Sequence, residues 1–302
     1  MANTTLLYGP NGYAIKSEVS TRVAGFLNDH GNHGLERYDG LQIDDKALPE
    51  ILQGASLFSD ERLVIIRDAD KNKPLWNALA DWIKKIPDEV QVILVSDQPD
   101  KRTKTFKELQ KQGTVREYGL LKRPELIRWV IEQSGGKLDN NLAGQLVDRV
   151  GDDQFRLSGE LDKLLLHGSI TKELIIDLVE PTPQHSVFEL LDAVINRRQN
   201  TAEELLNELR LSEDPYMFFG MLSKQVHMLA ALVSGANAGQ VAKEFGAHPF
   251  VVQKLSSAAR TLKWPQIKTI IDTLAKLDEE LKSTGIEPWL LIEKATIKIT
   301  AR

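Results

Sequence analysis

The sequence predicts an α/β domain with a mostly parallel sheet, followed by an all-helical remainder. Strand-like and helical patterns alternate from Thr4 to Tyr118, and no strand pattern appears after Tyr118. The strand patterns in the middle of this part are continuously apolar, most clearly from Val90 to Val95. Continuous apolar strands that alternate with helices are typical of a parallel sheet with helices on both faces.

Runs of β-branched and aliphatic residues mark the expected strands, and glycine, proline and asparagine mark the turns. The helical pattern that reaches Gly54 is expected to end there, because glycine suits a helix terminus. The expected elements are strand 4–8, turn 9–12, a helix to about 29, strand 35–38, a helix ending near 54, strand 63–66, helix 74–86, strand 90–95, a basic helix near 101–112 and strand 114–118.

After Tyr118 the expected structure is helical, in two parts separated by the Pro-punctuated linker 181–185. In the second part, Ser186 to Glu189 and Thr201 to Glu204 have the capping-box pattern that opens a helix. Four short helices are expected in the first part, at 123–133, 139–150, 153–166 and 170–179. The expected domains are 1–120 (α/β), 121–182 (small helical) and 183–302 (larger helical).

The composition limits the classes of function. The chain of 302 residues has 42% hydrophobic and 27% charged residues and no stretch of 18 apolar residues, so we expect a cytoplasmic globular protein. Its net charge of −5 argues against a nonspecific nucleic-acid binder with a basic surface. Cysteine is absent and the histidines lack a metal spacing, so we expect neither a metal site nor a thiol nucleophile.

The turn Gly9–Gly12 connects a strand to a helix, where a glycine-rich loop can bind phosphate. A working loop of this kind needs G-x-x-x-x-G-K-[ST], but residues 14, 15 and 16 are Ala, Ile and Lys. The pair Lys16-Ser17 is displaced by one residue, which rotates the lysine by about 100° around a helix. We therefore expect no nucleotide or other cofactor to bind here. An active ATPase with a variant nucleotide site is the alternative.

A second part of an ATPase site is also incomplete. The strand 63–66 should be followed by acidic residues that hold Mg²⁺ and activate water. Instead Arg67 comes first, and Ala69 separates Asp68 from Asp70. A role in a turn or at a helix start is the favoured interpretation of these aspartates. No Ser-His-Asp or paired-carboxylate arrangement suggests other chemistry, so we assign no catalytic residue.

Leu57 and Phe58 are two large apolar residues between Ser56 and Ser59, in the connection that precedes strand 63–66. If this connection lies on the surface, the pair forms an apolar tip in a polar surrounding. Each such side chain contributes roughly 1.5–3 kcal/mol when buried, so the pair can anchor a partner protein. The alternative is that both residues fold inward and cap the domain core.

Positive charges gather on or beside the helix near 101–112. They are Lys101, Arg102, Lys104, Lys107 and Lys111. Such a run can face a nucleic-acid backbone, or it can be a solvated helix face. Lys101, Arg102, Lys104 and Lys107 are our candidates for residues near DNA.

Residues 238–246 and 248–255 resemble a helix-turn-helix motif. A recognition helix should present Arg, Lys, Asn or Gln to base edges. The second helix offers only Gln253, Lys254 and the later Arg260 among apolar and small residues. A packed helical hairpin is therefore favoured over the alternative of a helix-turn-helix DNA-binding regulator.

Several sequence patterns agree in their order and spacing over most of the chain. They are the strand-turn-helix start without a working phosphate loop, Ser56-Leu57-Phe58 with Arg62-Leu63-Val64-Ile65-Ile66, Gly159–Leu164 with Ile170-Thr171, and the C-terminal segments Phe245–Leu255, Ala258–Arg260 and Leu277–Gly285. Together these patterns resemble the delta subunit family of the bacterial DNA polymerase III clamp loader.

The resemblance implies an AAA+-type subunit with an α/β domain, a small helical lid domain and a helical collar domain. Such a subunit does not hydrolyse ATP; it binds the sliding clamp (the beta subunit) and opens the ring for loading onto primed DNA during replication. The clamp-contacting pair of the family falls on Leu57 and Phe58. The collar, from about Ser186, assembles with the ATP-binding gamma/tau subunits and delta-prime. The assembly is part of the DNA polymerase III holoenzyme, a nucleotidyltransferase complex.

Overall fold

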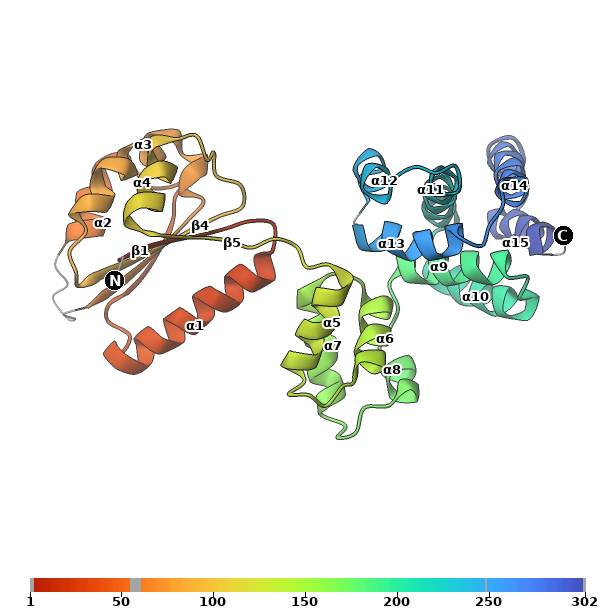
Figure 1. Ribbon diagram of the computed structural model, residues 1–302, viewed down its shortest axis with the longest axis horizontal. Helices are drawn as coiled ribbons and strands as arrows, with labels where there is room; N and C mark the ends of the chain where they lie inside the picture. Colours follow the sequence, from red (N-terminus) through yellow and green to blue (C-terminus); the bar gives the residue numbers. More distant parts are fainter. Residues whose placement is uncertain (1–2, 55–60, 248, 301–302) are drawn as a thin grey trace. The chain divides into compact units, whose positions relative to one another are not determined.

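The computed structural model describes residues 3–54, 61–247 and 249–300. The chain divides into two compact units, Met1–Leu121 and Lys122–Arg302 (Figure 1). The boundary between the two units, after Leu121, lies one residue from the predicted end of the α/β domain at residue 120. The further division of the second unit at residue 182 stays a prediction.

A five-stranded sheet with the order β2-β3-β4-β1-β5 forms the centre of the first unit, and each neighbouring pair is parallel. In the register of the central strands, Leu6 lies opposite Leu94 and Val64 opposite Val92. The predicted parallel α/β class is confirmed. The strands are β1 (Thr4–Tyr8), β2 (Leu35–Asp39), β3 (Arg62–Arg67), β4 (Val90–Ser96) and β5 (Thr114–Glu117).

Helices cover both faces of this sheet, with α1 on one face and α2, α3 and α4 on the other (Figure 1). Alternate residues of a strand point to opposite faces, so Leu63 and Ile65 pack against α1 while Val64 and Ile66 pack against the other layer. Both faces are buried, which explains the continuously apolar strands. The helices are α1 (Gly12–His30), α2 (Leu48–Gln53), α3 (Lys73–Trp82) and α4 (Lys104–Gln112).

The second unit is helical throughout its described residues, as predicted. Its helices are α5 (Arg123–Gln133), α6 (Asn140–Val150), α7 (Gln154–Leu165), α8 (Lys172–Leu178), α9 (Pro183–Ile195), α10 (Gln199–Ser212), α11 (Pro215–Val233), α12 (Ala238–Glu244), α13 (Pro249–Ala259), α14 (Trp264–Ser283) and α15 (Pro288–Thr300).

Two predicted helix starts in this unit are wrong. Helix α9 does not open with a capping box at Ser186; Thr182 caps it and Pro183 is its first residue. Proline suits this position because its fixed φ is helical and its missing N–H would have no helical partner there. Helix α10 likewise begins at Gln199, so Thr201 lies in its first turn.

Helix α11 has the length and composition of a membrane-spanning helix, with a mean hydropathy of 1.2. Its buried side chains Phe218, Leu222, Val226 and Leu229 instead belong to the core of the second unit. Helices α9, α13 and α14 pack against it. Its apolar character is therefore explained by a central place in a helical bundle.

Candidate functional site

The loop Gly9–Gly12 leaves the carboxyl end of β1, which lies between β4 and β5 in the sheet. From β1 the chain crosses to β2 at the far edge, returns through β3 and β4, and then places β5 on the other side of β1. Ligands of open α/β sheets bind at such a switch point, outside the carboxyl ends of the strands. This loop is therefore the place where a nucleotide site is expected in this fold.

The backbone N–H groups of this loop are already bonded within the chain. The bonds join Gly9 N to Ser96 O (3.3 Å), Asn11 N to Tyr118 O (3.2 Å), Gly12 N to Pro10 O (3.1 Å) and Ala14 N to Asn11 Oδ1 (3.0 Å). A phosphate-binding loop needs such N–H groups to point at the ligand. Pro10 offers no N–H at all. The N–H groups of this loop are therefore occupied by hydrogen bonds within the chain, and we call this arrangement the closed loop.

The loop is also packed closely against the chain that leaves β5. Gly9 has φ +128°, and a Cβ atom on it would lie 2.3 Å from the carbonyl oxygen of Tyr118. The buried side chain of Asn11 donates to the carbonyl of Gly119 at 3.2 Å. Ile15, at the position of the nucleotide-binding lysine, is buried under the sheet. Lys16 is exposed.

A polar cluster of Tyr8, Lys101 and Glu117 lies beside this loop at the ends of β1 and β5. The Tyr8 hydroxyl donates to Glu117 Oε2 at 2.7 Å, and Lys101 Nζ donates to the same oxygen at 2.9 Å. Burial, followed by the bond to Glu117, raises the pKa of Tyr8. The hydrogen bonds from Tyr8 and Lys101 lower the pKa of Glu117. The cluster leaves its carboxylate charged and already satisfied by the chain's own donors.

Asp68, the first aspartate after β3, serves a turn, as predicted. Asp68 has the left-handed conformation (φ 55°), and its carboxylate forms an ion pair with Lys71 at 2.7 Å. Its backbone N–H donates to Val95 O at 2.9 Å, which ties the turn to β4. Among the described residues, no group of three or more His, Asp or Glu side chains is arranged to hold a metal ion.

The predicted apolar pair, Leu57 and Phe58, lies outside the described residues. The structure describes both flanks of this segment, Gly54 at the end of α2 and Arg62 at the start of β3. Arg62 is only 6% exposed, and its guanidinium group bonds to Glu36 of β2 and to the carbonyl of Gly54, so Arg62 links the two flanks of the segment. A buried arginine at this place has no periodicity signal, so sequence reasoning did not single it out.

The candidate DNA-proximal residues are mostly paired with acidic side chains. Helix α4 begins at Lys104, capped by Thr103, so Lys101 and Arg102 precede the helix. Lys101 pairs with Glu117, Arg102 with Asp100, Lys104 with Asp81 and Lys111 with Glu108. Exposed pairs of this kind are weak, so the basic side chains can still exchange these partners for phosphates. Lys107 is exposed.

The helix-turn-helix candidate is used for packing. In α13, Val252 and Leu255 are buried in the core of the second unit. Lys254 Nζ lies 3.0 Å from His185 Nδ1 of α9 and 4.4 Å from the ring centre of Phe188. Burial lowers the pKa of Lys254. A recognition helix presents such a side chain to DNA, whereas this lysine faces the protein, which favours the packed hairpin.

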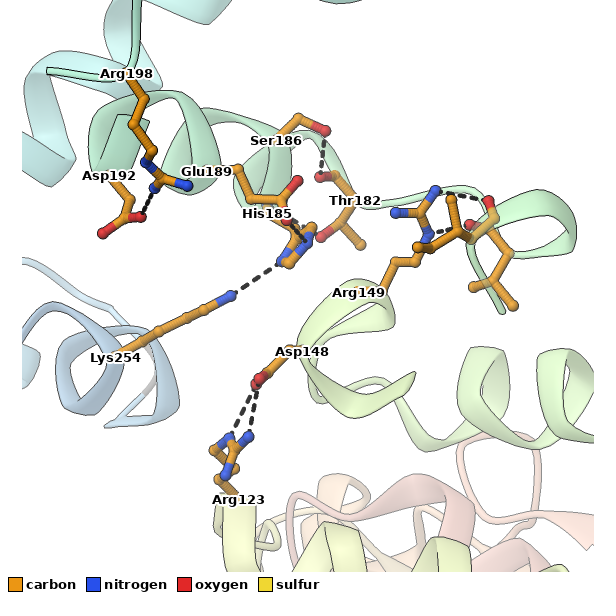
Figure 2. A network of polar contacts seen from close by, with 12 residues as sticks. Arg123, Asp148, Arg149, Thr182, His185, Ser186, Glu189, Asp192, Arg198 and Lys254 are labelled. Atoms are coloured by element: carbon orange, nitrogen blue, oxygen red, sulfur yellow. Dashed lines mark hydrogen bonds and ion pairs between the residues drawn. The ribbon is translucent and has the colours of Figure 1, made fainter. Parts of the chain in front are cut away.

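Figure 2 shows the polar contacts near Lys254, in which Lys254 of α13 meets His185 of α9 and Arg123 of α5 meets Asp148 of α6. His185 Nε2 lies 3.1 Å from Glu189, so His185 bridges a lysine and a carboxylate. Arg123 holds Asp148 through two bonds of 2.9 and 2.8 Å. Arg149 donates to the carbonyls of Val179 and Ile176 before α9. Apart from the i,i+4 pair His185–Glu189, these contacts join residues far apart in the sequence, and local patterns did not reveal them.

Two family models match the chain. The model described as "DNA polymerase III, delta subunit" matches residues 6–118, and the model of that subunit's C-terminal domain matches residues 184–299. The chain belongs to the DNA polymerase III delta subunit family. The first match covers the sheet unit with its closed loop, and the second covers the bundle formed by helices α9–α15.

Two similar delta proteins agree with this membership. The DNA polymerase III subunit delta of Bacillus subtilis is 24% identical over 324 residues, covering 98% of this chain and 92% of that protein. The solved structure of a Bacillus subtilis DNA clamp loader delta protein has a TM-score of 0.72 at 22% identity. It covers 99% of this chain and 96% of that chain. The latter similarity shows that the delta fold extends over the whole chain.

Proposed function

We propose that this delta family chain is the non-catalytic subunit of a DNA polymerase III clamp loader that binds the sliding clamp and opens its ring. The observation that carries the proposal is the loop Gly9–Gly12. The fold offers a nucleotide site there, but the loop's N–H groups bond to the chain itself and Gly9 packs against Tyr118. A subunit with such a loop acts by binding rather than by ATP hydrolysis.

The clamp contact that we propose is the pair Leu57 and Phe58. Its support is the pattern Ser56-Leu57-Phe58 before Arg62 in a member of this family. The residues that flank this segment, Gly54 and Arg62, are joined by a hydrogen bond. Insertion of two apolar side chains into a clamp pocket stabilises a clamp conformation only by its differential affinity for the open and closed rings. The subunit therefore works by preferring the open form.

The proposed partners follow from the same assignment. The sheet unit contacts the beta clamp, and residues 183–302 form the collar that joins the gamma/tau and delta-prime subunits in the cytoplasm. Residues 121–182 form a lid-like domain between them in the sequence. Primed DNA is bound by the complete loader, with Lys101, Arg102, Lys104 and Lys107 as candidates on this subunit.

Binding of the purified chain to the sliding clamp of the same organism tests the proposal. We expect a complex whose affinity is the same with and without Mg-ATP, and no ATP turnover by the chain alone. ATP hydrolysis that disappears in Lys16→Ala would establish the variant ATPase instead. Absence of any clamp complex would contradict the proposed role.

A further inference from the structure

Arg62 is a buried hub of hydrogen bonds at the first residue of β3. Its Nε and Nη2 atoms each donate to a carboxylate oxygen of Glu36 at 2.8 Å. Its Nη1 atom donates to the carbonyl of Gly54 at 2.6 Å, and Nη2 also donates to the carbonyl of Ile51 at 3.0 Å. The planar group is thus held in one orientation by a bidentate carboxylate and two backbone carbonyls.

These bonds connect three separate pieces of the first unit. Glu36 lies on β2, the neighbour of β3 in the sheet, and also accepts a hydrogen bond of 2.6 Å from Tyr38. Ile51 and Gly54 lie in and after the last turn of α2. Gly54 immediately precedes residues 55–61, and Arg62 immediately follows them. One side chain therefore joins both ends of this segment to the edge of the sheet.

Gly54 is fitted to this arrangement by its lack of a side chain. Its N–H donates to the carbonyl of Glu50 at 2.9 Å, and a Cβ atom on Gly54 would lie 2.3 Å from that oxygen. The chain can leave α2 in this direction only because position 54 is glycine. The Gly54 carbonyl is then available to Arg62 Nη1.

We propose that Arg62 is a positioning residue for clamp binding: it fixes the two ends of the segment that carries Leu57 and Phe58. The inference rests on the proposed function, since it assigns Arg62 a role in the clamp contact assigned there. Fixing the ends of a binding segment lowers the ordering cost that binding otherwise incurs. Stability alone is a weak reason for this arrangement, because buried ion pairs can often be replaced by apolar residues without loss.

The requirement is for an arginine and not merely for a positive charge. A lysine keeps the charge but presents a single ammonium group, which cannot reproduce the planar fork that reaches Glu36, Ile51 and Gly54 together. Arg62→Lys therefore separates the positioning role from the charge. Arg116→Lys is the matched control, because Arg116 pairs with Glu18 at 3.0 Å within the same unit and contacts neither end of the segment.

The first measurement does not involve the clamp. The chain contains no cysteine, so cysteines introduced at Gln53 and Glu61 can carry a pair of spin labels. We expect a narrow distance distribution between the labels, which broadens in Arg62→Lys and is unchanged in Arg116→Lys. An unchanged distribution in Arg62→Lys overturns the inference, whatever the clamp does.

The second measurement is the affinity for the sliding clamp, with circular dichroism as the test of folding. We expect Arg62→Lys to bind roughly tenfold more weakly, which corresponds to about 1.4 kcal/mol, and Arg116→Lys to bind like the unmodified chain. A purely structural role predicts a lower unfolding midpoint with unchanged affinity, which overturns the inference. If Arg62→Lys does not fold, the variant Glu36→Gln is used in its place, because it weakens the bonds between residue 36 and Arg62 but keeps the contacts of Arg62 with the Gly54 and Ile51 carbonyls. We expect Glu36→Gln to bind the clamp more weakly as well. Unchanged clamp binding by this variant overturns the inference.

Failure of the proposed function gives a different result. If Leu57→Ala with Phe58→Ala leaves clamp binding intact, the assigned contact is wrong and a positioning role toward it falls as well. The spin labels would still respond to Arg62→Lys in that case. If the double variant abolishes binding while a folded Arg62→Lys binds normally, only the positioning inference is overturned.

Discussion

Replacement of Gly9 by alanine tests the closed loop at the switch point of the sheet. Gly9 has φ +128°, a conformation that residues with a side chain rarely adopt. The added methyl group would lie 2.3 Å from Tyr118 O and 3.0 Å from Tyr118 N. Both are backbone atoms, so the loop and the chain leaving β5 must separate.

The expected cost follows from the bonds that this separation breaks. Asn11 N donates to Tyr118 O at 3.2 Å, and Tyr118 N donates to Tyr8 O at 2.7 Å. Each bond contributes about 1 kcal/mol net, and the backbone strain at position 9 adds about 1–3 kcal/mol. We therefore expect Gly9→Ala to lower the unfolding free energy of the first unit by about 3–5 kcal/mol.

Hydrogen exchange of β4 peptides at increasing urea concentration measures this unit separately from the helical unit. Gly25→Ala is the matched control, because Gly25 lies inside α1 with no atom within 4 Å of an added Cβ. We expect this control to raise stability by about 0.5–1 kcal/mol, since alanine favours helix. The same substitution thus has opposite signs at two positions. Equal stability of Gly9→Ala and the unmodified chain would refute the close packing on which the closed loop depends.

Three further predictions follow from other contacts. Mg-ATP should leave the unfolding temperature of the chain unchanged. If the loop bound Mg-ATP, a concentration of 100 times the Kd would add about 2.7 kcal/mol to the unfolding free energy, so a clear rise in the unfolding temperature would contradict the closed loop. Burial, and then the bond to Glu36, raise the pKa of Tyr38 to about 12. The folded state thus holds this proton more tightly than the unfolded state, so stability should fall from pH 10 to pH 12, and this fall should be smaller in Tyr38→Phe; an equal fall in both proteins would refute the assignment. Arg149→Ala should speed hydrogen exchange at residues 176–182, because the Arg149 side chain donates to two carbonyls there; unchanged exchange would show that these bonds do not order this segment.

The sheet unit was largely predictable because its signals are local. A run such as Val90–Val95 is almost continuously apolar, and such runs alternating with helical patterns indicate a parallel sheet covered on both faces. The incomplete phosphate motif was likewise readable from residues 9–17. What the motif could not show is how the loop satisfies its own N–H groups. Those bonds involve Ser96 and Tyr118, which are remote in the sequence.

The candidate site was less predictable because its contacts join distant segments. Arg62 bonds to Glu36, 26 positions away, and Lys254 contacts His185, 69 positions away. Neither pairing follows from a periodicity, and each depends on the tertiary arrangement. In the basic run beside α4, the partner of Lys104 is likewise remote, since Asp81 comes from α3.

Clamp binding by Leu57→Ala with Phe58→Ala is the most direct test of the central claim. The matched control is Leu41→Ala with Leu120→Ala, which removes two apolar side chains that are 57% and 51% exposed in the same unit. Two hot-spot residues together account for a loss of at least about a hundredfold in affinity. We predict this loss with an unchanged circular dichroism spectrum, while the control binds the clamp like the unmodified chain. Normal clamp binding by the first double variant, or loss of its folding, would contradict the account.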